Sequence, residues 1–401
     1  MSNEGRMDVA PSTTRIPIGP RWLRGSIQSM TVVSPSSPPT SRRGLRTVSR
    51  RAVIAGIVAF LSLQAGLNLA IQQEWIPVRD PVYAEKRDFL TQHPAFFGST
   101  GSSAPLRLMA LGSSRTQLAF DARRFSEATG AELGRPVESF NFGCPAAGPL
   151  TSSLYLQRLL EAGLTTDYLI VEIHTGFIAR QPIPFESRWL HAYRLRPEEL
   201  TQLRGYGWEI ADPPHHGWKG WLSAAYAYRM GLTNHYAPVM LPCPYGLTVG
   251  VRSDPWGYVA GFDPPRSDYP RAIQRSFQEY APALADYHVG GAGCEAIRNM
   301  LTRAQAQGIR TAVVLMPEST EFRSWYGAEG TAEIDAFAQR LGQDFGIPVF
   351  DARTWVPDRG FADGHHLTEA GAQTYTDQLS KAVIPWLRSG GAQGWATGGA
   401  R

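Results

Sequence analysis

The stretch LRLMALGSSR, residues 106–115, contains the pattern that decides the fold. Five of its first six residues are apolar, which predicts a strand that is buried on both faces of a sheet. Gly112 and Ser113 then allow a sharp turn, and a helical pattern follows over residues 117–129. A buried strand that turns directly into a helix is typical of an α/β protein with a parallel sheet.

The same alternation of short apolar runs and helical patterns continues along the chain. It predicts further strands at 137–142, 168–173, 311–316 and 348–350, and helices at 150–162, 296–307, 332–345 and 369–387. We therefore expect a three-layer α/β/α domain over residues 105–388, with a parallel sheet covered on both faces. Ligands bind such sheets at the carboxyl ends of the strands, so the residues after each strand are the candidates for a site.

Residues 178–290 interrupt this pattern, because they are rich in Trp, Tyr, Pro, His and Gly and have weak periodicity. We expect an insertion over the strand ends, which serves either as a lid or substrate-binding subdomain or as structural embellishment. Within it, Trp256 could stack on a sugar or could pack inside the insertion.

The charge of the chain is unevenly distributed. Residues 1–51 carry nine arginines against two acidic residues, a net charge of +7, which leaves −3 for the remaining 350 residues. Residues 52–401, the body of the protein, therefore lack the net positive charge of a nucleic-acid-binding domain, and no nucleic acid is expected as a partner. Residues 1–51 are rich in Ser, Pro, Thr and Arg, and we expect them to form a disordered tail.

A charge-free stretch follows the tail. Residues 52–71, AVIAGIVAFLSLQAGLNLAI, are long enough to cross about 30 Å of hydrocarbon. Arginines precede the stretch and Glu74 follows it, which predicts an uncleaved transmembrane signal anchor at 52–73 with a cytoplasmic tail and an extracytoplasmic (periplasmic) body. A cleaved signal peptide and a buried core helix are the alternatives. Residues 74–104 are expected to form a stalk, and 389–401 a disordered C-terminal tail.

Two segments carry residues suited to nucleophilic catalysis. Ser114 follows the first strand at a predicted helix start, where its oxygen would be exposed beside free N–H groups. The segment FADGHHLTEAG, residues 361–371, follows the last strand. It offers His366 as a base and Asp363 to fix its tautomer, with Thr368 as the cap of the next helix. An Asp with two histidines could also bind a metal, but the sequence offers no further ligand cluster beyond His215 and His216, so neither a metal nor a cofactor is expected.

Together these segments resemble the SGNH (GDSL-like) hydrolase superfamily, whose first block is Gly-Asp-Ser and whose last is Asp-x-x-His. The resemblance implies that Ser114 is the nucleophile, His366 the base and Asp363 its orienting partner. Ser113 replaces the family's Asp, and this variant, followed by Arg115, is similar to a membrane-anchored subgroup that includes DltD-like and alginate-acetylation-type proteins. Residues 315–319 and 323–326 also look like the fourth-strand region of that subgroup.

The resemblance also assigns an oxyanion hole. Besides the Ser114 N–H, the family uses a glycine after the second strand, for which Gly148 is favoured over Gly143. The family's third block supplies an Asn side chain after the third strand. Here the sequence after residue 171 is EIHTG, in which His174 or Thr175 would have to substitute.

Other polar residues near the strand ends have open roles. Arg115 could bind a substrate carboxylate or phosphate, or pair with a carboxylate of the fold. Glu172 is expected to be a structural group. Cys144 is expected to be a buried hydrophobe rather than a reactive thiol, and Cys243 and Cys294 could form a disulfide outside the membrane.

These features predict a membrane-anchored, extracytoplasmic serine esterase or O-acyltransferase. The expected substrate is an acyl ester of an envelope polysaccharide or glycoconjugate, processed through an acyl-Ser114 intermediate. The alternative is a non-catalytic envelope assembly or carbohydrate-binding protein that keeps the fold.

Overall fold

The computed structural model describes residues 42–98, 104–190, 194–208, 223–240, 253–261 and 263–390. The chain divides into two compact units, Met1–Gly56 and Ile57–Arg401, and the second unit contains the sheet.

The sheet of the second unit has five parallel strands in the order β2-β1-β3-β4-β5. They are β1 (Leu106–Gly112), β2 (Val137–Gly143), β3 (Tyr168–Ile173), β4 (Arg310–Leu315) and β5 (Val349–Asp351). Strand β1 lies second in this order and pairs with both β2 and β3, so the order of the strands reverses between β1 and β3. Ligands bind at the carboxyl ends of the strands beside such a switch point, which places Ser114 in the expected position.

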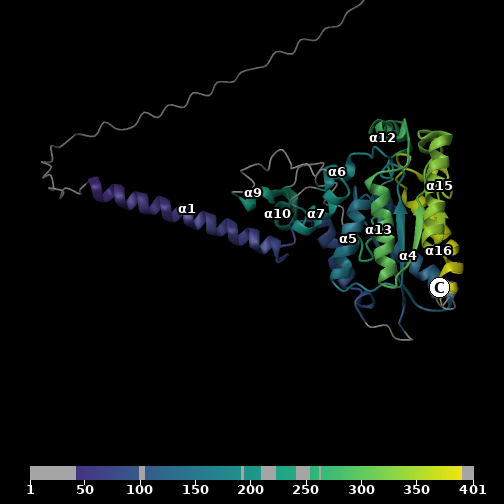
Figure 1. Ribbon diagram of the computed structural model, residues 1–401, viewed down its shortest axis with the longest axis horizontal. Coiled ribbons are helices and arrows are strands. Elements are labelled where there is room, and N and C mark those ends of the chain that lie inside the picture. The colour runs from purple at the N-terminus through teal and green to yellow at the C-terminus, as the bar shows by residue number, and fades with distance from the viewer. Residues whose placement is uncertain are drawn as a thin grey trace, which may run out of the picture. The chain divides into compact units, whose positions relative to one another are not determined.

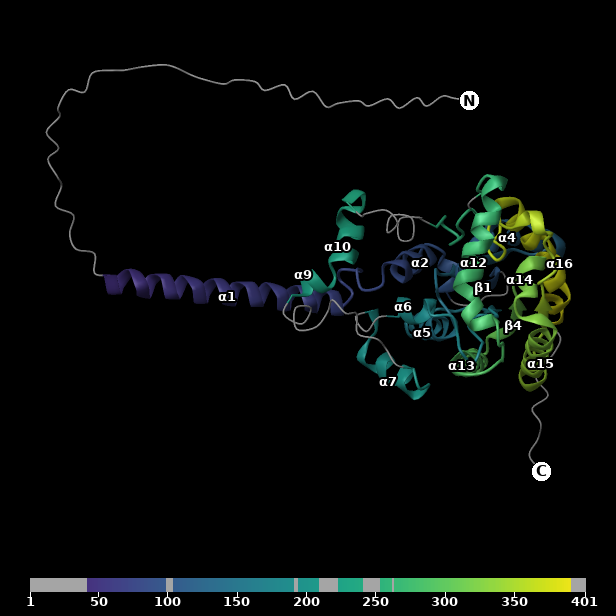
Figure 2. The same cartoon turned by 90° about the horizontal axis from the view of Figure 1, so that it is seen from above.

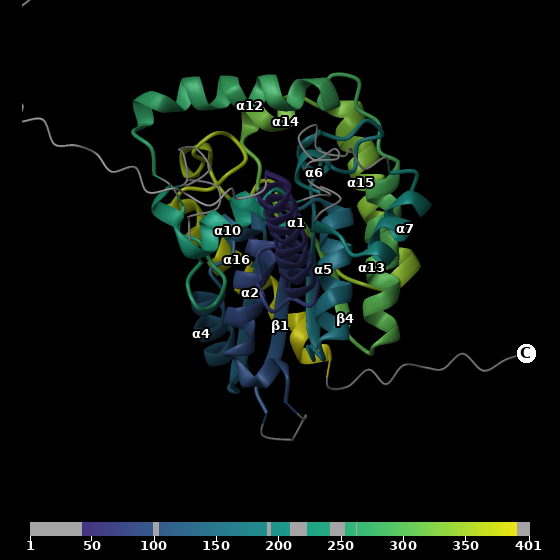
Figure 3. The same ribbon diagram turned by 90° about the vertical axis from the view of Figure 1, so that its left-hand side faces the viewer.

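Helices cover both faces of the sheet, which confirms the three-layer α/β/α prediction (Figure 1; Figure 3). Successive residues of β1 point to opposite faces, so that Leu108 and Ala110 belong to one apolar core and Met109 and Leu111 to the other. The first core is closed by α3 (Ser114–Ala119), α4 (Ala122–Leu133) and α16 (Glu369–Ser389), and the second by α5 (Pro149–Glu161), α13 (Ala292–Ala306) and α15 (Gly327–Phe345).

The single helix expected over 117–129 is wrong, because the chain forms two helices there, α3 and α4. Phe120 between them is extended and buried. Asp121 caps α4 by accepting a hydrogen bond from the Arg124 N–H (3.0 Å), and Asn141 Nδ2 donates to the Phe120 carbonyl (2.7 Å) at the end of α3. These two polar groups end one helix and start the next.

The expected stalk is also wrong for the described residues 74–98, which pack on the domain. They form α2 (Pro81–Thr91) and a 3₁₀ turn, η1 (Pro94–Phe96), and their apolar side chains are buried in the core. Lys86 on α2 is fully buried, and its Nζ donates to the carbonyls of Asn141 (2.9 Å) and Gly257. Burial of the ammonium lowers the pKa of Lys86 to about 8.

Helix α1 (Arg42–Gln72) includes the apolar run. Its residues Ser49–Gln72 have a mean hydropathy of 1.9, are almost all exposed, and are long and apolar enough to cross a membrane by length and composition. The expectation of disorder is wrong for residues 42–51, which extend this helix, since arginine is a good helix former. Residues 1–41 and 391–401 of the two predicted tails lie outside the described residues.

The described parts of the insertion, residues 178–290, contain helices and 3₁₀ turns. Its longest helix, α12, crosses the carboxyl ends of the strands (Figure 3). Ile273 of α12 lies against Gly364, and the Tyr280 ring packs on His365 at 4.8 Å between centroids. The described residues of the insertion form α6 (Phe185–Trp189), α7 (Pro197–Gly205), α9 (Ala224–Ala227), α10 (Arg229–Tyr236), η3 (Pro238–Met240), η4 (Arg266–Asp268) and α12 (Tyr269–Leu284). Two short elements outside the insertion are α14 (Thr320–Ser324) and η5 (Asp358–Gly360).

Candidate active site

Ser114 occupies the first position of α3, directly after β1. Gly112 is required before it, because a Cβ there would lie 2.2 Å from Glu172 Oε2. Ser113 is the N-cap of α3, and its hydroxyl accepts a hydrogen bond from the Arg115 N–H (3.1 Å). Ser114 is partly exposed although the residues on both sides of it are buried, so the turn presents its hydroxyl at the surface of the strand ends.

The Glu172 carboxylate fixes this turn from the neighbouring strand β3. It accepts hydrogen bonds from the Ser113 N–H (2.7 Å), the Ser113 hydroxyl (2.7 Å), the Thr116 N–H (3.3 Å) and the Thr116 hydroxyl. A negative charge at a helix N-terminus is favourable. The prediction that Glu172 is a structural group is therefore confirmed.

The segment with the second motif folds into a tight turn between β5 and α16. The Ala362 N–H donates to the His366 carbonyl (2.9 Å), and Gly364 has a φ of 95°, a conformation that favours glycine. Asp363 Oδ1 accepts hydrogen bonds from the backbone N–H groups of His365 (3.2 Å) and His366 (2.8 Å). Thr368 caps α16 as predicted, by accepting from the Gly371 N–H (3.2 Å).

The structure brings the three predicted catalytic residues into one hydrogen-bonded chain. Ser114 Oγ lies 2.9 Å from His366 Nε2, and His366 Nδ1 lies 2.8 Å from Asp363 Oδ2. Ser114 and His366 are 252 residues apart in sequence. A serine within reach of a histidine whose other nitrogen meets a carboxylate is the arrangement that activates a nucleophile.

The electrostatics of the turn keep Asp363 ionised. Burial alone would raise its pKa, but the electrostatic interactions with the neighbouring His365 and His366 rings and the hydrogen bonds from His366 outweigh burial and hold the pKa of Asp363 well below its usual range. His365 is buried, and desolvation lowers the pKa of His365 to about 3, so its ring is neutral. The ionised carboxylate is thus available to hold the Nδ1–H of His366.

Arg115 does not face a substrate. Its guanidinium is buried, where Nη1 pairs with Glu318 Oε1 (3.2 Å) and Nη2 donates to the carbonyls of Pro317 (2.6 Å) and Met316 (3.2 Å). Of the two roles left open for Arg115, the pairing with a carboxylate of the fold is the one confirmed. Glu318 also accepts a hydrogen bond from the Tyr326 hydroxyl (2.7 Å), and both residues lie in the segments 315–319 and 323–326 singled out in the sequence.

His174 and Thr175, the two predicted substitutes for the oxyanion Asn of the resemblance, both have partners within the fold. His174 Nε2 lies 3.2 Å from the Tyr280 hydroxyl, and its Nδ1 accepts from the Gly176 N–H (3.1 Å). Burial lowers the pKa of His174 well below its usual value. Thr175 Oγ1 donates to Glu318 Oε1 (3.0 Å). Both predicted substitutes are thus buried and engaged within the fold.

The two glycines proposed as oxyanion donors are engaged as well. The Gly143 N–H donates to Asn141 Oδ1 (2.8 Å), and the Gly148 N–H donates to the carboxyl group of Glu186. Glu186 also accepts from the Thr151 N–H (2.7 Å) and hydroxyl (2.8 Å). Among the predicted donors, only the Ser114 N–H has no hydrogen-bond partner within the described residues.

Glu186 is a residue that the sequence reasoning missed. It comes from α6 of the insertion, and no motif surrounds it in the sequence. Burial raises the pKa of Glu186 to about 7, although the N–H groups of Thr151, Leu150 and Gly148 oppose the rise. A carboxyl group that titrates near neutrality therefore lies at the N-terminus of α5.

Trp256 packs within the fold. Its carbonyl accepts from the Asn141 N–H (2.9 Å), the Arg123 guanidinium lies 5.2 Å from the centre of its indole, and the His93 ring lies 5.9 Å away. Side chains already cover this indole, which favours the packing role over sugar stacking.

The described cysteines are unpaired thiols. Cys144 is fully buried, which raises its pKa to about 12 and confirms its role as a small hydrophobe. Cys294 Sγ donates to the Ile178 carbonyl (3.6 Å), and burial raises the pKa of Cys294 to about 11. The predicted pairing of Cys294 with Cys243 cannot be placed, because Cys243 lies outside the described residues.

One group of potential metal ligands occurs in the described part of the chain, namely Asp363, His365 and His366. Their ligand atoms lie within 4.8 Å of one another. The hydrogen bonds of Asp363 to His366, and of His366 to Ser114, already account for this grouping. His215 and His216 lie outside the described residues.

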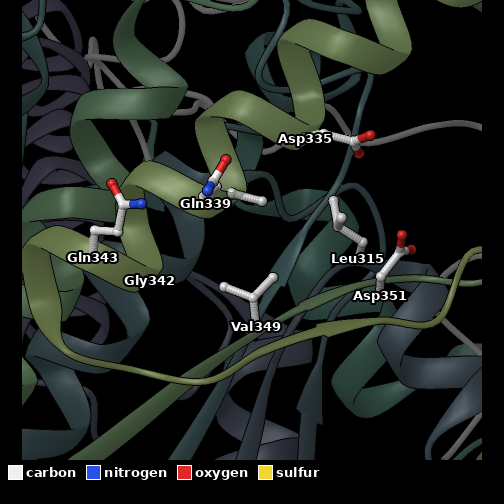
Figure 4. A pocket seen from close by; sticks show the side chains of 8 residues that line it. Leu315, Asp335, Gln339, Gly342, Gln343, Val349 and Asp351 are labelled. Atoms are coloured by element: carbon white, nitrogen blue, oxygen red, sulfur yellow. The ribbon is translucent and has the colours of Figure 1, made fainter.

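A cavity of ≈ 380 Å³ lies away from these residues, between α15 and the strands β4 and β5 (Figure 4). Apolar side chains, among them Leu315 and Val349, form part of its wall, and Asp335 and Asp351 both pair with Arg353 at its rim. None of the catalytic candidates lines it.

Comparison with known proteins finds similarity at the level of three-dimensional structure. No protein-family model and no curated protein matches this sequence. Similar solved structures include a carbohydrate acetylesterase family member from Sinorhizobium meliloti, with 10% identity over 71% of this chain and 98% of that chain and a TM-score of 0.34. A second carbohydrate acetylesterase from that organism has 14% identity over 70% and 99%, with a TM-score of 0.31. A GDSL-like lipase from Bacteroides thetaiotaomicron has 11% identity over 76% and 99%, with a TM-score of 0.34.

These identities and TM-scores are low, so the chemistry of the site follows from its own geometry. The fold and site define an α/β/α protein with a Ser–His–Asp hydrogen-bonded chain at the carboxyl ends of a parallel sheet.

Proposed function

We propose that this protein is a membrane-anchored serine esterase or O-acyltransferase of the SGNH type. The hydrogen-bonded chain from Ser114 through His366 to Asp363 carries the proposal. Such a chain makes a serine hydroxyl nucleophilic, because the base is within reach of its proton and the carboxylate fixes the tautomer of the base.

In the proposed reaction, Ser114 Oγ attacks the carbonyl carbon of an acyl ester and its proton passes to His366 Nε2. The tetrahedral intermediate collapses when His366 returns this proton to the leaving alcohol, and the acyl group stays on Ser114. Water or a sugar hydroxyl then gives its proton to His366 and attacks the acyl carbon. The bond from this carbon to Ser114 Oγ breaks, and His366 returns the proton to Ser114. Water as the acceptor makes the protein an esterase, and a sugar makes it an O-acyltransferase. The cycle requires no cofactor.

The oxyanion of the intermediate would be stabilised by the Ser114 N–H at the start of α3. This group has the positive end of the helix dipole behind it and no partner among the described residues. The N–H groups of Gly143 and Gly148 can contribute only if Asn141 and Glu186 release them. Each such donor is worth about 3 kcal/mol of transition-state stabilisation, so we expect slow turnover in this conformation.

The proposed location rests on α1. Its apolar residues suit a single membrane anchor, and the arginines before it favour a cytoplasmic N-terminus and an extracytoplasmic, periplasmic site. An anchored site at the cell envelope suits an acyl ester of an envelope polysaccharide or glycoconjugate. The sequence resemblance to DltD-like and alginate-acetylation-type proteins points to the same class of substrate.

Labelling with a fluorophosphonate probe tests the proposal. The detergent-solubilised full-length protein should form a covalent adduct, Ser114→Ala should abolish it, and Ser324→Ala, which changes an exposed serine on α14, should not. An unlabelled wild-type protein with an intact thermal melt would contradict the enzymatic function. Labelling that persists in Ser114→Ala would exclude Ser114 as the nucleophile.

A specific observation favours a second candidate, a non-catalytic envelope assembly or carbohydrate-binding protein. The oxyanion Asn of the third block is missing, and the glycine N–H groups already have partners. Under this alternative the probe does not react, and binding of envelope polysaccharide by the Ser114→Ala variant equals that of the wild type.

A further inference from the structure

The helices α9 and α10 of the insertion lie against the carboxyl-terminal part of α1 (Figure 2). The Gln64 side chain of α1 is buried, and its Oε1 accepts hydrogen bonds from the Ser223 hydroxyl (3.1 Å) and the Ala225 N–H (3.0 Å). The apolar run contains two amide side chains, Gln64 and Asn68, and the oxygen of Gln64 is hydrogen-bonded at the start of α9.

Further contacts hold this assembly at the end of α1. Gln72 Nε2 lies 3.4 Å from the Tyr228 hydroxyl. Ile71 and Val78 are buried in an apolar cluster with Ala224 and Tyr228. Helix α10 approaches so closely that a Cβ on Gly231 would lie 2.3 Å from the Val78 carbonyl oxygen. Backbone contact of this kind fixes α9 and α10 on the chain that follows α1.

The position of Gln64 along α1 sets the depth of α9. A hydrocarbon layer of about 30 Å needs about 20 helical residues, which, counted from Ala52, reach Ile71. Gln64 lies seven residues before Ile71, or about 10 Å along the helix axis. If α1 spans the membrane, α9 contacts it at a level that lipid occupies.

The surface of this segment suits lipid. Its exposed large apolar side chains are Tyr226, Tyr236, Val239 and Met240, of which Val239 and Met240 are 92% and 74% exposed. Residues 223–240 contain no Asp or Glu. Tyrosine is enriched at membrane interfaces, and Arg229, whose guanidinium lies 4.3 Å from the Tyr226 ring centre, can extend toward lipid headgroups.

We infer that residues 223–240 form a membrane-inserted segment, which places its exposed apolar side chains in the outer leaflet beside the anchor. The occupant of this surface is the lipid bilayer. The inference rests on the proposed membrane anchorage of α1 and is independent of the proposed chemistry. It makes the anchor part of the folded insertion, so the domain is held at a fixed height above the bilayer.

Quenching by lipid-attached nitroxides tests this inference. In a full-length chain, Cys243 and Cys294 are replaced by serine and the fully buried Cys144 is kept, because it is out of reach of a labelling reagent. One added cysteine, from Val239→Cys, Leu61→Cys or Phe277→Cys, carries an environment-sensitive fluorophore. The proteins are reconstituted, without any other protein, in phosphatidylethanolamine–phosphatidylglycerol vesicles with or without doxyl lipid. Leu61 on α1 is the reference for lipid contact, and Phe277 on α12, 47% exposed, is the reference for water.

We expect nitroxide lipid to quench the label at 239 about as strongly as the label at 61, and to leave the label at 277 unchanged. Quenching of the label at position 61 but not at position 239 overturns the inference that residues 223–240 are inserted in the membrane, but is consistent with the membrane anchorage of α1. No quenching at either position overturns the membrane anchorage itself, together with the inference. Neither result bears on the fluorophosphonate reactivity of Ser114.

Discussion

Replacing Asp363 with Asn separates the two tasks of this carboxylate. Oδ2 accepts from His366 Nδ1 (2.8 Å), while Oδ1 accepts from the backbone N–H groups of His365 and His366. An amide has only one oxygen to accept with. If that oxygen faced Nδ1, the NH₂ group would meet two N–H donors and two hydrogen bonds would be lost, at a cost of about 2 kcal/mol. We therefore expect the oxygen to keep the two backbone bonds and the NH₂ group to face His366 Nδ1.

In that orientation Nδ1 must accept, so the proton of the neutral imidazole moves to Nε2. Nε2 lies 2.9 Å from Ser114 Oγ and could then no longer take the serine proton. This loss of the correct tautomer lowers kcat by about 10⁴-fold in serine hydrolases, which corresponds to about 5.5 kcal/mol. Stability should change much less, because the backbone hydrogen bonds of the turn are kept.

The assay compares kcat for a p-nitrophenyl ester and the thermal melt of Asp363→Asn with those of the wild type. The control is Asp358→Asn, five residues earlier, whose exposed side chain accepts a single hydrogen bond from the Thr320 N–H (2.8 Å) and should keep it as an amide. A folded Asp363→Asn variant with kcat within about tenfold of the wild type would refute the tautomer argument.

Two further predictions concern stability. Arg115→Ala leaves Glu318 buried without its cation and should lower the free energy of unfolding by about 3–5 kcal/mol in urea denaturation. The control Arg388→Ala, which breaks an exposed pair with Glu132, should change it by less than about 1 kcal/mol, and equal effects would contradict the buried pairing. Burial raises the pKa of Glu186 from 4.5 to about 7, so the folded state binds the proton more tightly, and this carboxyl loses up to about 3 kcal/mol of stability as the pH rises through that window. Relative to the wild type, Glu186→Gln should therefore gain stability between pH 4.5 and 7, and a difference that stays constant over this range would show that Glu186 does not titrate there.

The strands were predictable because a parallel sheet buried on both faces leaves continuous apolar runs in the sequence. The predicted ends of β1 and β3 differ from the observed ends by at most one residue. The stalk was misassigned because the signal for α2 is local and weak, with Asp80 as N-cap and Pro81 at the first turn. Lys86 also argued against a buried helix, because lysine is usually exposed. Here its side chain is fully buried, and its Nζ donates to two carbonyl oxygens.

The hydrogen-bonded chain of Ser114, His366 and Asp363 was predictable for a different reason. Asp363 and His366 share one turn, so their spacing already fixes their contact, and Ser114 needs only to lie at the same end of the sheet. Several other predicted site residues have partners from remote segments, which no local pattern in the sequence identifies. Arg115 meets Glu318 across 203 residues, and His174 meets Tyr280 across 106 residues.

The N–H groups of Gly143 and Gly148 show how the difference between a local and a remote partner bears on function. Asn141 holds the Gly143 N–H from within the same strand, so the sheet itself fixes that bond. Glu186 holds the Gly148 N–H from the insertion, through a buried carboxyl whose pKa lies near 7. Movement of α6 or protonation of Glu186 weakens the hydrogen bond to the Gly148 N–H without disturbing the sheet. The hydrogen bond between Asn141 and the Gly143 N–H lies within one strand, so it does not depend on α6 or Glu186. A second oxyanion donor at this site would therefore be the Gly148 N–H, and its availability depends on Glu186 of the insertion. The insertion is also the part of the chain whose structure is least predictable from the sequence.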